Sequence, residues 1–291
     1  MASIQKRLPE NVPGDFFVDA TCIDCDTCRQ LAPDTFREQG EFSVVYHQPD
    51  TKDQARLALM SLVACPTGSI GAIERHDFRA GIDAFPFRIH ENVYFCGFTA
   101  ESSFGAWSYL IVRPLAAGGN VLVDSPRFSS RLVKRIAEIG GVSTMFLTHR
   151  DDVADHRRFA GEFGCERIMH MADGARRLGI ERVVEGEEEL CIGDDLLIIP
   201  TPGHTRGHMV LLYNKFLFTG DHLAWSLERE SLTAFRSVAW YSWPVKTRSM
   251  EKLLNYEFEW VLPGHGRIHH DTCENMRLHL KRCIAWMQAR D

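Results

Sequence analysis

Apolar and β-branched residues recur in short runs along the chain from residue 89 onward, and polar turns separate these runs. Runs of this length and composition predict β-strands. We therefore expect strands over residues 93–95, 108–112, 120–124, 145–148, 196–200, 209–213, 216–219 and 260–262.

Longer segments in which apolar residues recur every three or four positions lie between these runs and predict helices. These segments cover residues 131–139, 155–163 and 246–256, and an amphipathic segment over residues 271–290 predicts a closing helix. Strands mixed with helices in this way indicate sheets covered by helices, in the α+β or α/β class.

The first quarter of the chain has a pattern of its own. A β-type run covers residues 42–46, and a helical pattern covers residues 54–64. This region ends near Ile73, and the segment 79–87, which contains Gly and Pro, is typical of a linker. We therefore predict two domains, residues 1–84 and residues 85–291.

The composition is that of an ordinary soluble globular protein, with 45% hydrophobic and 25% charged residues. No apolar run approaches the ~20 residues that a membrane-spanning helix needs. The first nine residues are polar and basic and lack the apolar core of a secretory signal. We expect a cytoplasmic protein that does not act at a membrane.

The net charge of −6 is concentrated in the first domain, where residues 1–84 contain 8 Lys or Arg and 13 Asp or Glu. An acidic surface repels phosphates, so we do not expect nucleic acid as a partner. The same surface suits a basic redox partner protein. A solvated acidic face that serves only solubility explains the charge equally well.

Four of the nine cysteines lie in this domain. Cys22, Cys25 and Cys28 are three positions apart, and the distant Cys65 is followed directly by Pro66. Close spacing in a cytoplasmic chain indicates a metal site rather than disulfides. Four thiolates in this arrangement suit one iron–sulfur cluster. They also suit a structural zinc ion, although zinc sites usually pair two C-x2-C units.

Residues 15–73 closely resemble a single-cluster bacterial-type ferredoxin in this layout. The resemblance implies a ferredoxin-like fold that transfers single electrons through one 4Fe–4S or 3Fe–4S cluster. The ligands that it implies are Cys22, Cys25, Cys28 and Cys65. A cluster would make the protein brown, with absorbance at about 400 nm, whereas a zinc site would leave it colourless.

Four short segments of the second domain place His or Asp beside a strand end or a turn. They contain His149 with Asp151, Asp155 and His156; His204 with His208; Asp221 with His222; and His265. Loops at strand ends can converge on one point while the sheet behind them fixes the geometry. Imidazole and carboxylate together suit zinc, iron or manganese. One such segment alone is usually structural, but four in series predict a metal site.

Residues 88–268 resemble the metallo-β-lactamase superfamily through these segments. The resemblance implies an αββα sandwich with one or two zinc, iron or manganese ions at the rim between its sheets. The ligands that it implies are His149, His204 and Asp221 for one metal and Asp155, His156 and His265 for a second, with Asp221 bridging.

The first segment departs from the family pattern H-x-H-x-D-H. Asp155 and His156 follow His149 two positions later than expected. The motif can be aligned on His149 or on the pair Asp155 and His156, and in both alignments Asp151 takes the place of a histidine. We therefore predict Asp151 as a ligand, with Asp152 as the fallback. A carboxylate in place of an imidazole adds negative charge and shifts the preference from zinc toward iron or manganese.

The remaining histidines have no ligand role by this resemblance, and we expect them in supporting or surface positions. They are His208, His222, His269 and His270. Residues 228–244, between the third and fourth segments, contain Trp240, Tyr241, Trp243 and Arg236. These side chains could stack on and pair with an anionic or aromatic ligand, although packing in the core and a salt bridge are the more common roles.

Three functions are compatible with these residues. Hydrolysis of a small-molecule ester, thioester or amide is the default of the family, with Asp155 orienting or deprotonating a metal-activated water. Residues 201–208 resemble the T-P-x-H-T-x-G-H segment of glyoxalase II-like thioesterases. A fused electron carrier instead suits a redox enzyme whose mono- or di-iron site is fed by the cluster. In a third interpretation the cluster is a non-catalytic sensor or structural staple.

Overall fold

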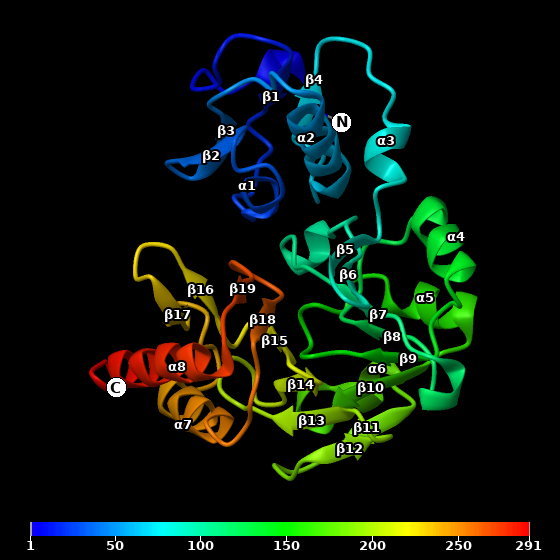
Figure 1. Ribbon diagram of the computed structural model, residues 1–291, viewed down its shortest axis with the longest axis vertical. Coiled ribbons are helices and arrows are strands. Elements are labelled where there is room, and N and C mark those ends of the chain that lie inside the picture. Colours follow the sequence, from blue (N-terminus) through cyan, green and yellow to red (C-terminus); the bar gives the residue numbers. More distant parts are fainter. Residues whose placement is uncertain (1, 291) are drawn as a thin grey trace. The chain divides into compact units, whose positions relative to one another are not determined.

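The computed structural model describes residues 2–290 (Figure 1), and the chain forms two compact units. The first comprises Met1–Val112, Pro126–Gly141 and Ala154–Phe159, and the second comprises Arg113–Ser125, Val142–Val153 and Ala160–Asp291. The units interleave along the sequence, so the predicted boundary between residues 84 and 85 stays a prediction.

The N-terminal part of the first unit contains two small antiparallel strand pairs and two helices. The pairs are β1 (Phe16–Val18) with β4 (Ile70–Ala72) and β2 (Phe36–Gln39) with β3 (Phe42–Val45), and the helices are α1 (Thr27–Leu31) and α2 (Lys52–Ala64). A short 3-10 helix over Ile4–Lys6 precedes them. Their shared core contains Phe16, Val18, Phe36, Val45 and Ala58, all nearly inaccessible to solvent.

Helix α2 positions Cys65, the last of the four predicted cluster ligands. The Thr51 side chain accepts a hydrogen bond from the Gln54 N–H and caps the first turn, where Asp53 complements the helix dipole. The helix ends at Ala64 because Pro66 disfavours helical geometry for the residue before it. Cys65 therefore leaves the helix end at a fixed position.

The rest of the first unit contains three antiparallel strands and short helices. The strands are β5 (Phe87–His90), β6 (Val93–Phe95) and β7 (Tyr109–Ile111), and the helices are α3 (Arg79–Ile82), the 3-10 turn Glu101–Ser103, α4 (Ser130–Glu138) and the start of α5 (His156–Phe163). The segment predicted as a linker thus contains α3, which packs against α2.

The second unit begins with four parallel strands. They are β8 (Val121–Val123), β9 (Thr144–Phe146), β10 (Glu166–His170) and β11 (Arg182–Val184). The 3-10 turn Leu115–Ala117 precedes β8, and the 3-10 turn Met171–Asp173 and helix α6 (Ala175–Leu178) connect β10 with β11. β8 and β9 are buried on both faces at nearly every position, which explains their continuous apolar sequences.

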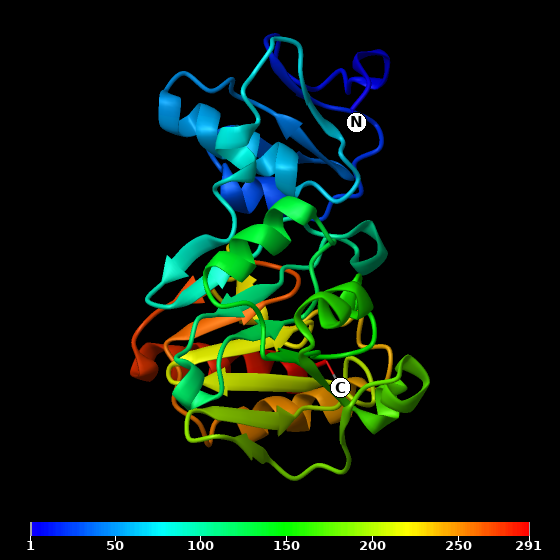
Figure 2. The same cartoon turned by 90° about the vertical axis from the view of Figure 1, so that its right-hand side faces the viewer.

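A six-stranded sheet forms the larger part of the second unit, and Figure 2 shows its longer strands side by side. The strand order is β12 (Leu190–Ile192), β13 (Leu196–Pro200), β14 (Met209–Tyr213), β15 (Phe216–Gly220), β18 (Trp260–Pro263) and β19 (His269–His270). A separate hairpin joins β16 (Ala224–Ser226) and β17 (Ser231–Thr233). Helices α7 (Trp243–Leu253) and α8 (Cys273–Gln288) pack together and share one core with the sheet.

The two C-terminal helices begin and end near the predicted bounds. Helix α7 starts three residues before the predicted 246, because the Ser242 hydroxyl caps it and Pro244 suits its first turn. Helix α8 is capped by Thr272, whose side chain accepts from the Asn275 N–H. Among residues 2–290, the structure contains no helix with the length and apolar character needed to cross a membrane.

Candidate functional site

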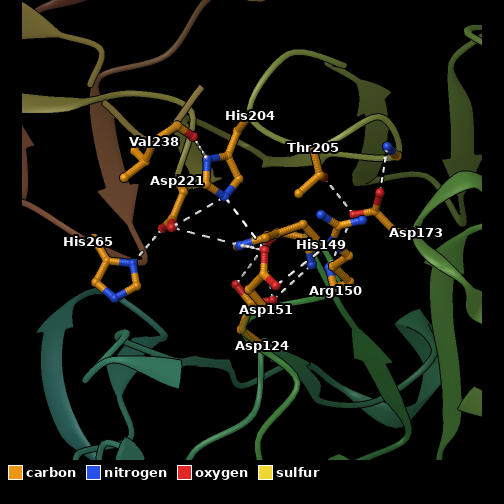
Figure 3. Close-up of polar contacts among 12 residues, drawn as sticks. Asp124, His149, Arg150, Asp151, Asp173, His204, Thr205, Asp221, Val238 and His265 are labelled. Carbon is orange, nitrogen blue, oxygen red and sulfur yellow. Dashed lines mark hydrogen bonds and ion pairs between the residues drawn. The ribbon is translucent and has the colours of Figure 1, made fainter. Parts of the chain in front are cut away.

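Four loops at strand ends bring His and Asp side chains to one point in the second unit (Figure 3). His149 follows β9, His204 lies between β13 and β14, Asp221 follows β15 directly, and His265 follows β18. Because these strands are buried and hydrogen-bonded, they hold the loops in fixed positions. Three of the predicted ligands, His149, His204 and Asp221, therefore lie in one group whose ligand atoms are within 4.8 Å of one another, and their ligand roles stay predictions.

The donor atoms of this group have the spacing of metal ligands. Nε2 of His149 and Nε2 of His204 lie 3.8 and 3.6 Å from Oδ2 of Asp221. Oδ2 of Asp151 lies 3.8 Å from the first of these nitrogens and 3.9 Å from the second. Four ligands about 2.0–2.2 Å from a tetrahedral zinc ion are about 3.3–3.6 Å apart, so small shifts suffice for binding.

The two imidazoles present lone pairs toward this point. Nδ1 of His204 lies 2.5 Å from the carbonyl oxygen of Val238, so it must donate and Nε2 is the unprotonated nitrogen. Nε2 of both His149 and His204 is buried without a hydrogen-bond partner among residues 2–290. Burial lowers the pKa of His149 to about 3 and also lowers the pKa of His204. Both rings are thus neutral at physiological pH, as metal ligands must be.

A hydrogen-bond relay fixes the ring of His149. Its Nδ1 lies 2.9 Å from the Thr148 hydroxyl, which in turn lies 2.9 and 3.0 Å from the two carboxylate oxygens of buried Asp124. The consistent assignment is that Nδ1–H donates to the hydroxyl and the hydroxyl donates to the carboxylate. A partner of this kind orients a metal-binding imidazole and selects its tautomer.

A second group contains Asp152, Asp221 and His265, with ligand atoms within 4.8 Å of one another. Nδ1 of His265 lies 2.6 Å from Oδ1 of Asp221, and this contact outweighs burial and lowers the pKa of Asp221. Asp152 is 1% exposed, and neither of its oxygens has a hydrogen-bond partner in the described part of the chain. Burial and then the charge of Asp221 raise the pKa of Asp152. A cation between the two carboxylates would relieve both effects.

Glycine in the Pro-Gly-His segment leaves room for this second group. A Cβ atom on Gly264 would lie 2.7 Å from Oδ2 of Asp152 and 3.2 Å from Oδ1 of Asp221. The missing side chain therefore allows both carboxylates to approach the His265 loop.

Two of the predicted ligands have other contacts in the first unit. Oδ2 of Asp155 accepts a hydrogen bond from the Phe128 N–H at 2.7 Å, and Oδ1 lies 4.0 Å from the Arg158 guanidinium. His156 is the first residue of α5 and is buried. Ligand roles for Asp155 and His156, and the catalytic role of Asp155, stay predictions.

Sequence reasoning did not identify Asp173, which joins two ligand loops. One oxygen accepts from the Thr205 hydroxyl at 2.6 Å and from the Arg150 N–H at 3.1 Å, and the other accepts from the Gly207 N–H at 2.7 Å. The residue is 2% exposed. It thus ties the His149 loop to the His204 loop, but its position in a short 3-10 turn gives no signal in the sequence.

Two further histidines lie beside the centre, and both are fully buried. Nδ1 of His208 lies 3.0 Å from the Thr201 hydroxyl, and the ring of His208 packs against those of His149 and His222. Neither belongs to the groups of potential ligands found among residues 2–290. Of the two expected positions, supporting or surface, burial therefore excludes the surface for His208 and His222.

A cavity of about 770 Å³ lies next to the His204 loop. Its lining includes the cationic side chains of Arg206, Arg248 and Lys252 together with Tyr241. The backbone N–H of Tyr241 donates to the His204 carbonyl at 3.0 Å, which connects the cavity wall with a metal-ligand loop. Glu185 and Glu187 also line the cavity, so it suits a ligand with both anionic and amide groups.

The four predicted cluster cysteines line one small cavity in the first unit. Backbone N–H groups point at two of the sulfurs: those of Asp24 and Ser43 lie 3.4 and 3.5 Å from Sγ of Cys22, and that of Ser69 lies 3.3 Å from Sγ of Cys65. Such contacts stabilise thiolate sulfur in iron–sulfur sites. The described residues contain no disulfide.

Burial makes this site unsuited to four free thiolates. Burial raises the pKa of the Cys25 thiol to about 11, and it raises the pKa of the Cys28 thiol well above its usual value. The neighbouring cysteines act in the same direction, since each thiolate repels the next. Coordination to iron removes the thiol protons, so a bound cluster resolves this conflict and the site fits one.

Gly105 and Trp107 lie beside Cys25 and Thr27, two of the residues that line the cluster cavity. The Thr27 hydroxyl lies 3.3 Å from the Gly105 carbonyl and accepts the Trp107 indole N–H at 3.2 Å. Gly105 has a φ of +82°, and a Cβ atom there would lie 2.6 Å from Cβ and 2.9 Å from Sγ of Cys25. Only glycine allows the chain to approach Cys25 so closely.

Comparison with known families gives two matches. Residues 18–72 match the profile of the 4Fe-4S single cluster domain of Ferredoxin I, and residues 103–265 match that of the Metallo-beta-lactamase superfamily. The second match covers more than half of the chain.

Among curated proteins, the chain is similar to hydroxyacylglutathione hydrolases. It is 30% identical to that of Rhodospirillum rubrum over 119 residues, which is 39% of this chain and 46% of the relative. It is 31% identical to that of Mesorhizobium japonicum over 120 residues, which is 39% and 47% of the two chains. The chain thus spans about half the length of the curated relatives it matches.

Among solved structures, the chain is similar to the DIM-1 metallo-beta-lactamase, with a TM-score of 0.54 and 19% identity over 70% of this chain and 96% of that one. It is also similar to VMB-1, with a TM-score of 0.51 and 17% identity over 70% and 95%. Likeness at this level of identity shows the fold. The fold class predicted from the sequence is confirmed.

Proposed function

This chain belongs to the metallo-β-lactamase superfamily, and from that premise we propose that it is a metal-dependent hydrolase of thioesters that carries a fused iron–sulfur module. The observation that carries the proposal is the convergence of two neutral imidazoles and two carboxylates, those of His149, His204, Asp151 and Asp221, on one point. Thioesters are favoured over esters and amides because the curated relatives are hydroxyacylglutathione hydrolases.

The residues present fit a metal ion on the criteria of lone-pair orientation, spacing and burial given above. When bound there, a metal lowers the pKa of a coordinated water and polarises the thioester carbonyl. The chain supplies the rest: the Thr148–Asp124 relay orients His149, the Val238 carbonyl orients His204, and Asp173 fixes the distance between their loops.

Two carboxylates can accept the proton of the attacking water. Asp155 holds this role by motif, as predicted from the sequence. Asp152 is supported by its burial beside Asp221 and by its two carboxylate oxygens, which have no hydrogen-bond partner in the described part of the chain. We propose that Asp155→Asn and Asp152→Asn distinguish them when kcat is measured at saturating metal, because the variant that loses kcat at full metal occupancy identifies the base.

The cavity beside His204 supports the binding of an anionic thioester. Arg206, Arg248 and Lys252 offer positive charge, and exposed Trp240 and Tyr241 offer flat surfaces beside the ligand loop. The Trp240 ring lies 4.9 Å from that of His204, so this aromatic side chain reaches the centre itself. Arg236 instead lies over the buried Trp243 ring at 5.8 Å, which is the packing role.

A second candidate function is redox chemistry at an iron site fed by the cluster. The observation that favours it is Asp151, whose carboxylate stands where the family pattern has an imidazole and makes the donor set harder and more negative. Such a set suits iron or manganese as well as zinc. In this case the acidic surface of residues 1–84 would bind a basic redox partner in the cytoplasm.

The decisive experiment uses anaerobically purified full-length protein. Metal analysis with Mössbauer or EPR spectra separates cluster iron from iron at the His/Asp centre, and hydrolysis of a hydroxyacyl thioester of glutathione is measured with the cluster oxidised and reduced. We expect turnover with zinc at the centre that does not change when the cluster is reduced. Absence of thioester, ester and amide hydrolysis at full metal occupancy would contradict the hydrolase proposal, and turnover that requires a reduced cluster would favour the redox function.

A further inference from the structure

A third group of potential metal ligands lies away from the centre described above. His269 in β19, Asp271 just before α8 and His279 within α8 each place one ligand atom within 4.8 Å of the others. Nε2 of His279 lies 3.5 Å from Oδ2 of Asp271, which is close to the separation of two ligands on one zinc ion. None of these residues belongs to the two groups that contain Asp221.

Two imidazole nitrogens of this group are buried without a hydrogen-bond partner among residues 2–290, namely Nε2 of His269 and Nδ1 of His279. The side chains of His279 and Asp271 are 14% and 29% exposed. The group is therefore shielded from bulk water yet open enough for an ion to enter. Buried polar atoms usually have partners, so the orphaned Nε2 of His269 indicates a missing ligand, whereas Nδ1 of His279 is the ring nitrogen that does not face Asp271.

Neighbouring side chains hold the three residues in position. The indole of Trp225 stacks on the His269 ring with centroids 3.4 Å apart and planes 6° apart, and it forms a T-shaped pair with the His279 ring at 4.9 Å. Oδ1 of Asp271 accepts from the Thr272 N–H at 2.7 Å and from Nδ2 of Asn275 at 2.9 Å. This leaves Oδ2 directed to His279, so the donor set is preorganised.

We propose that His269, Asp271 and His279 form a separate structural metal site that binds one Zn²⁺ ion, with water completing the coordination. Two imidazoles and one carboxylate are a donor set that zinc accepts. The ion would join β19, at the edge of the six-stranded sheet, to the helix α8.

The test compares zinc binding by full-length protein and three variants, with zinc alone as the probe. His279→Gln removes a ligand, and Asp271→Asn keeps the volume and the hydrogen bonds to Thr272 and Asn275. His270→Gln is the matched control, since His270 is the next residue of β19 and is exposed. We expect His279→Gln and Asp271→Asn to bind about one zinc ion fewer per chain than wild type and His270→Gln.

Two further measurements complete the test. Anomalous scattering at the zinc edge should show a peak among His269, Asp271 and His279, and zinc should raise the Tm of wild type more than that of Asp271→Asn. Thioester turnover should remain in all three variants, so this result is independent of the proposed function. Equal zinc content in wild type, His279→Gln and Asp271→Asn, without such a peak, would overturn the proposal.

Discussion

The hydroxyl of Thr148 links the proposed ligand His149 to a buried carboxylate, whereas the hydroxyl of Thr201 contacts a histidine outside the proposed ligand groups. Thr148 lies between His149 and Asp124, whereas Thr201 contacts His208, which is in none of the described ligand groups. Both threonines are fully buried. The pair therefore separates an effect on metal binding from the general cost of removing a buried hydroxyl.

We expect Thr148→Val to weaken metal binding by about 10- to 100-fold, because the His149 ring loses the partner that orients it. Competition with a chromogenic chelator measures the change in affinity. Thr201→Val should lower the free energy of unfolding about as much as Thr148→Val does, but it should leave the metal affinity nearly unchanged. Equal losses of affinity in both variants would show that the relay has no specific role.

The buried carboxylate of Asp152 leads to a prediction with two parts. Asp152→Asn should reduce the metal content, because the group with Asp221 and His265 loses a ligand. It should also stabilise the metal-free protein by about 1 kcal/mol or more, since a neutral amide costs less to bury than an unpartnered carboxylate. Metal analysis and urea denaturation after chelation measure the two effects. Asp194→Asn, at an exposed position, should change neither.

At the scale of single residues, motifs in the sequence identified the candidate ligands that the structure brings together but not the residues that support them. His149, His204 and Asp221 were predicted because each follows a strand in a recognisable segment. Asp152 was only the fallback, since the insertion before Asp155 obscures the alignment. Asp124 and Asp173 carry no signal, because what makes them important is the tertiary contact and not the neighbouring sequence.

At the scale of elements, the turn at Gly105 controls access to Cys25. Gly105→Ala should lower the cluster content, measured as absorbance near about 400 nm per chain, because the new methyl group would lie against the sulfur. Gly40→Ala is the control: Gly40 has a φ of +64°, but nothing lies within 4 Å of a Cβ there. Gly40→Ala should lower stability through backbone strain alone and should keep the cluster content of the wild type. Cluster loss in both variants would contradict a specific contact.

The pairing of β10 with β11 is supported by an ion pair whose contribution depends on pH. The hydrogen bonds from Arg167 lower the pKa of Glu181 to about 2. Because this pKa is lower in the folded than in the unfolded state, the stabilisation is present above about pH 4.5 and is lost as the pH falls toward 2. The stability difference between wild type and Glu181→Gln should therefore shrink over that range.

Denaturant unfolding of both proteins at a series of pH values measures this difference. Glu166→Gln is a suitable control, because Glu166 is an exposed neighbour on the same strands whose carboxylate lies 3.8 Å from Arg182. Its effect should be small at every pH. A difference for Glu181→Gln that does not change with pH would contradict the role given to the Arg167 contacts.

The periodicity of the sequence predicted long buried elements better than short ones. The strands over 196–200 and 209–213 have the predicted bounds, because continuous apolar runs of that length have few alternatives. Short strands such as β1, β16 and β17 were missed, since three residues carry too little periodicity. Helix α3 was missed because a four-residue helix shows no periodicity in its sequence.

At the scale of the whole molecule, two chemically different cofactor sites serve one chain. Oxygen and nitrogen donors form the His/Asp centre, whereas the cysteine site is buried and made of sulfur. A hard chelator should therefore remove the hydrolytic metal before it attacks the cluster. We expect EDTA under anaerobic conditions to abolish thioester turnover while the absorbance near about 400 nm persists, and zinc to restore turnover. Simultaneous loss of both would mean that the sites are not independent.

The glycine-lined approach to Cys25 limits how this protein can be dissected. The gene segment for residues 1–84 encodes every proposed sulfur ligand, yet the glycine that lies against Cys25 and the tryptophan that is hydrogen-bonded to Thr27 are encoded more than twenty codons downstream. A fragment cut after residue 84 would thus expose the cluster to oxygen on one side, and it should bleach faster in air than the intact chain. Transplanting the iron–sulfur module into another enzyme would require those downstream codons as well.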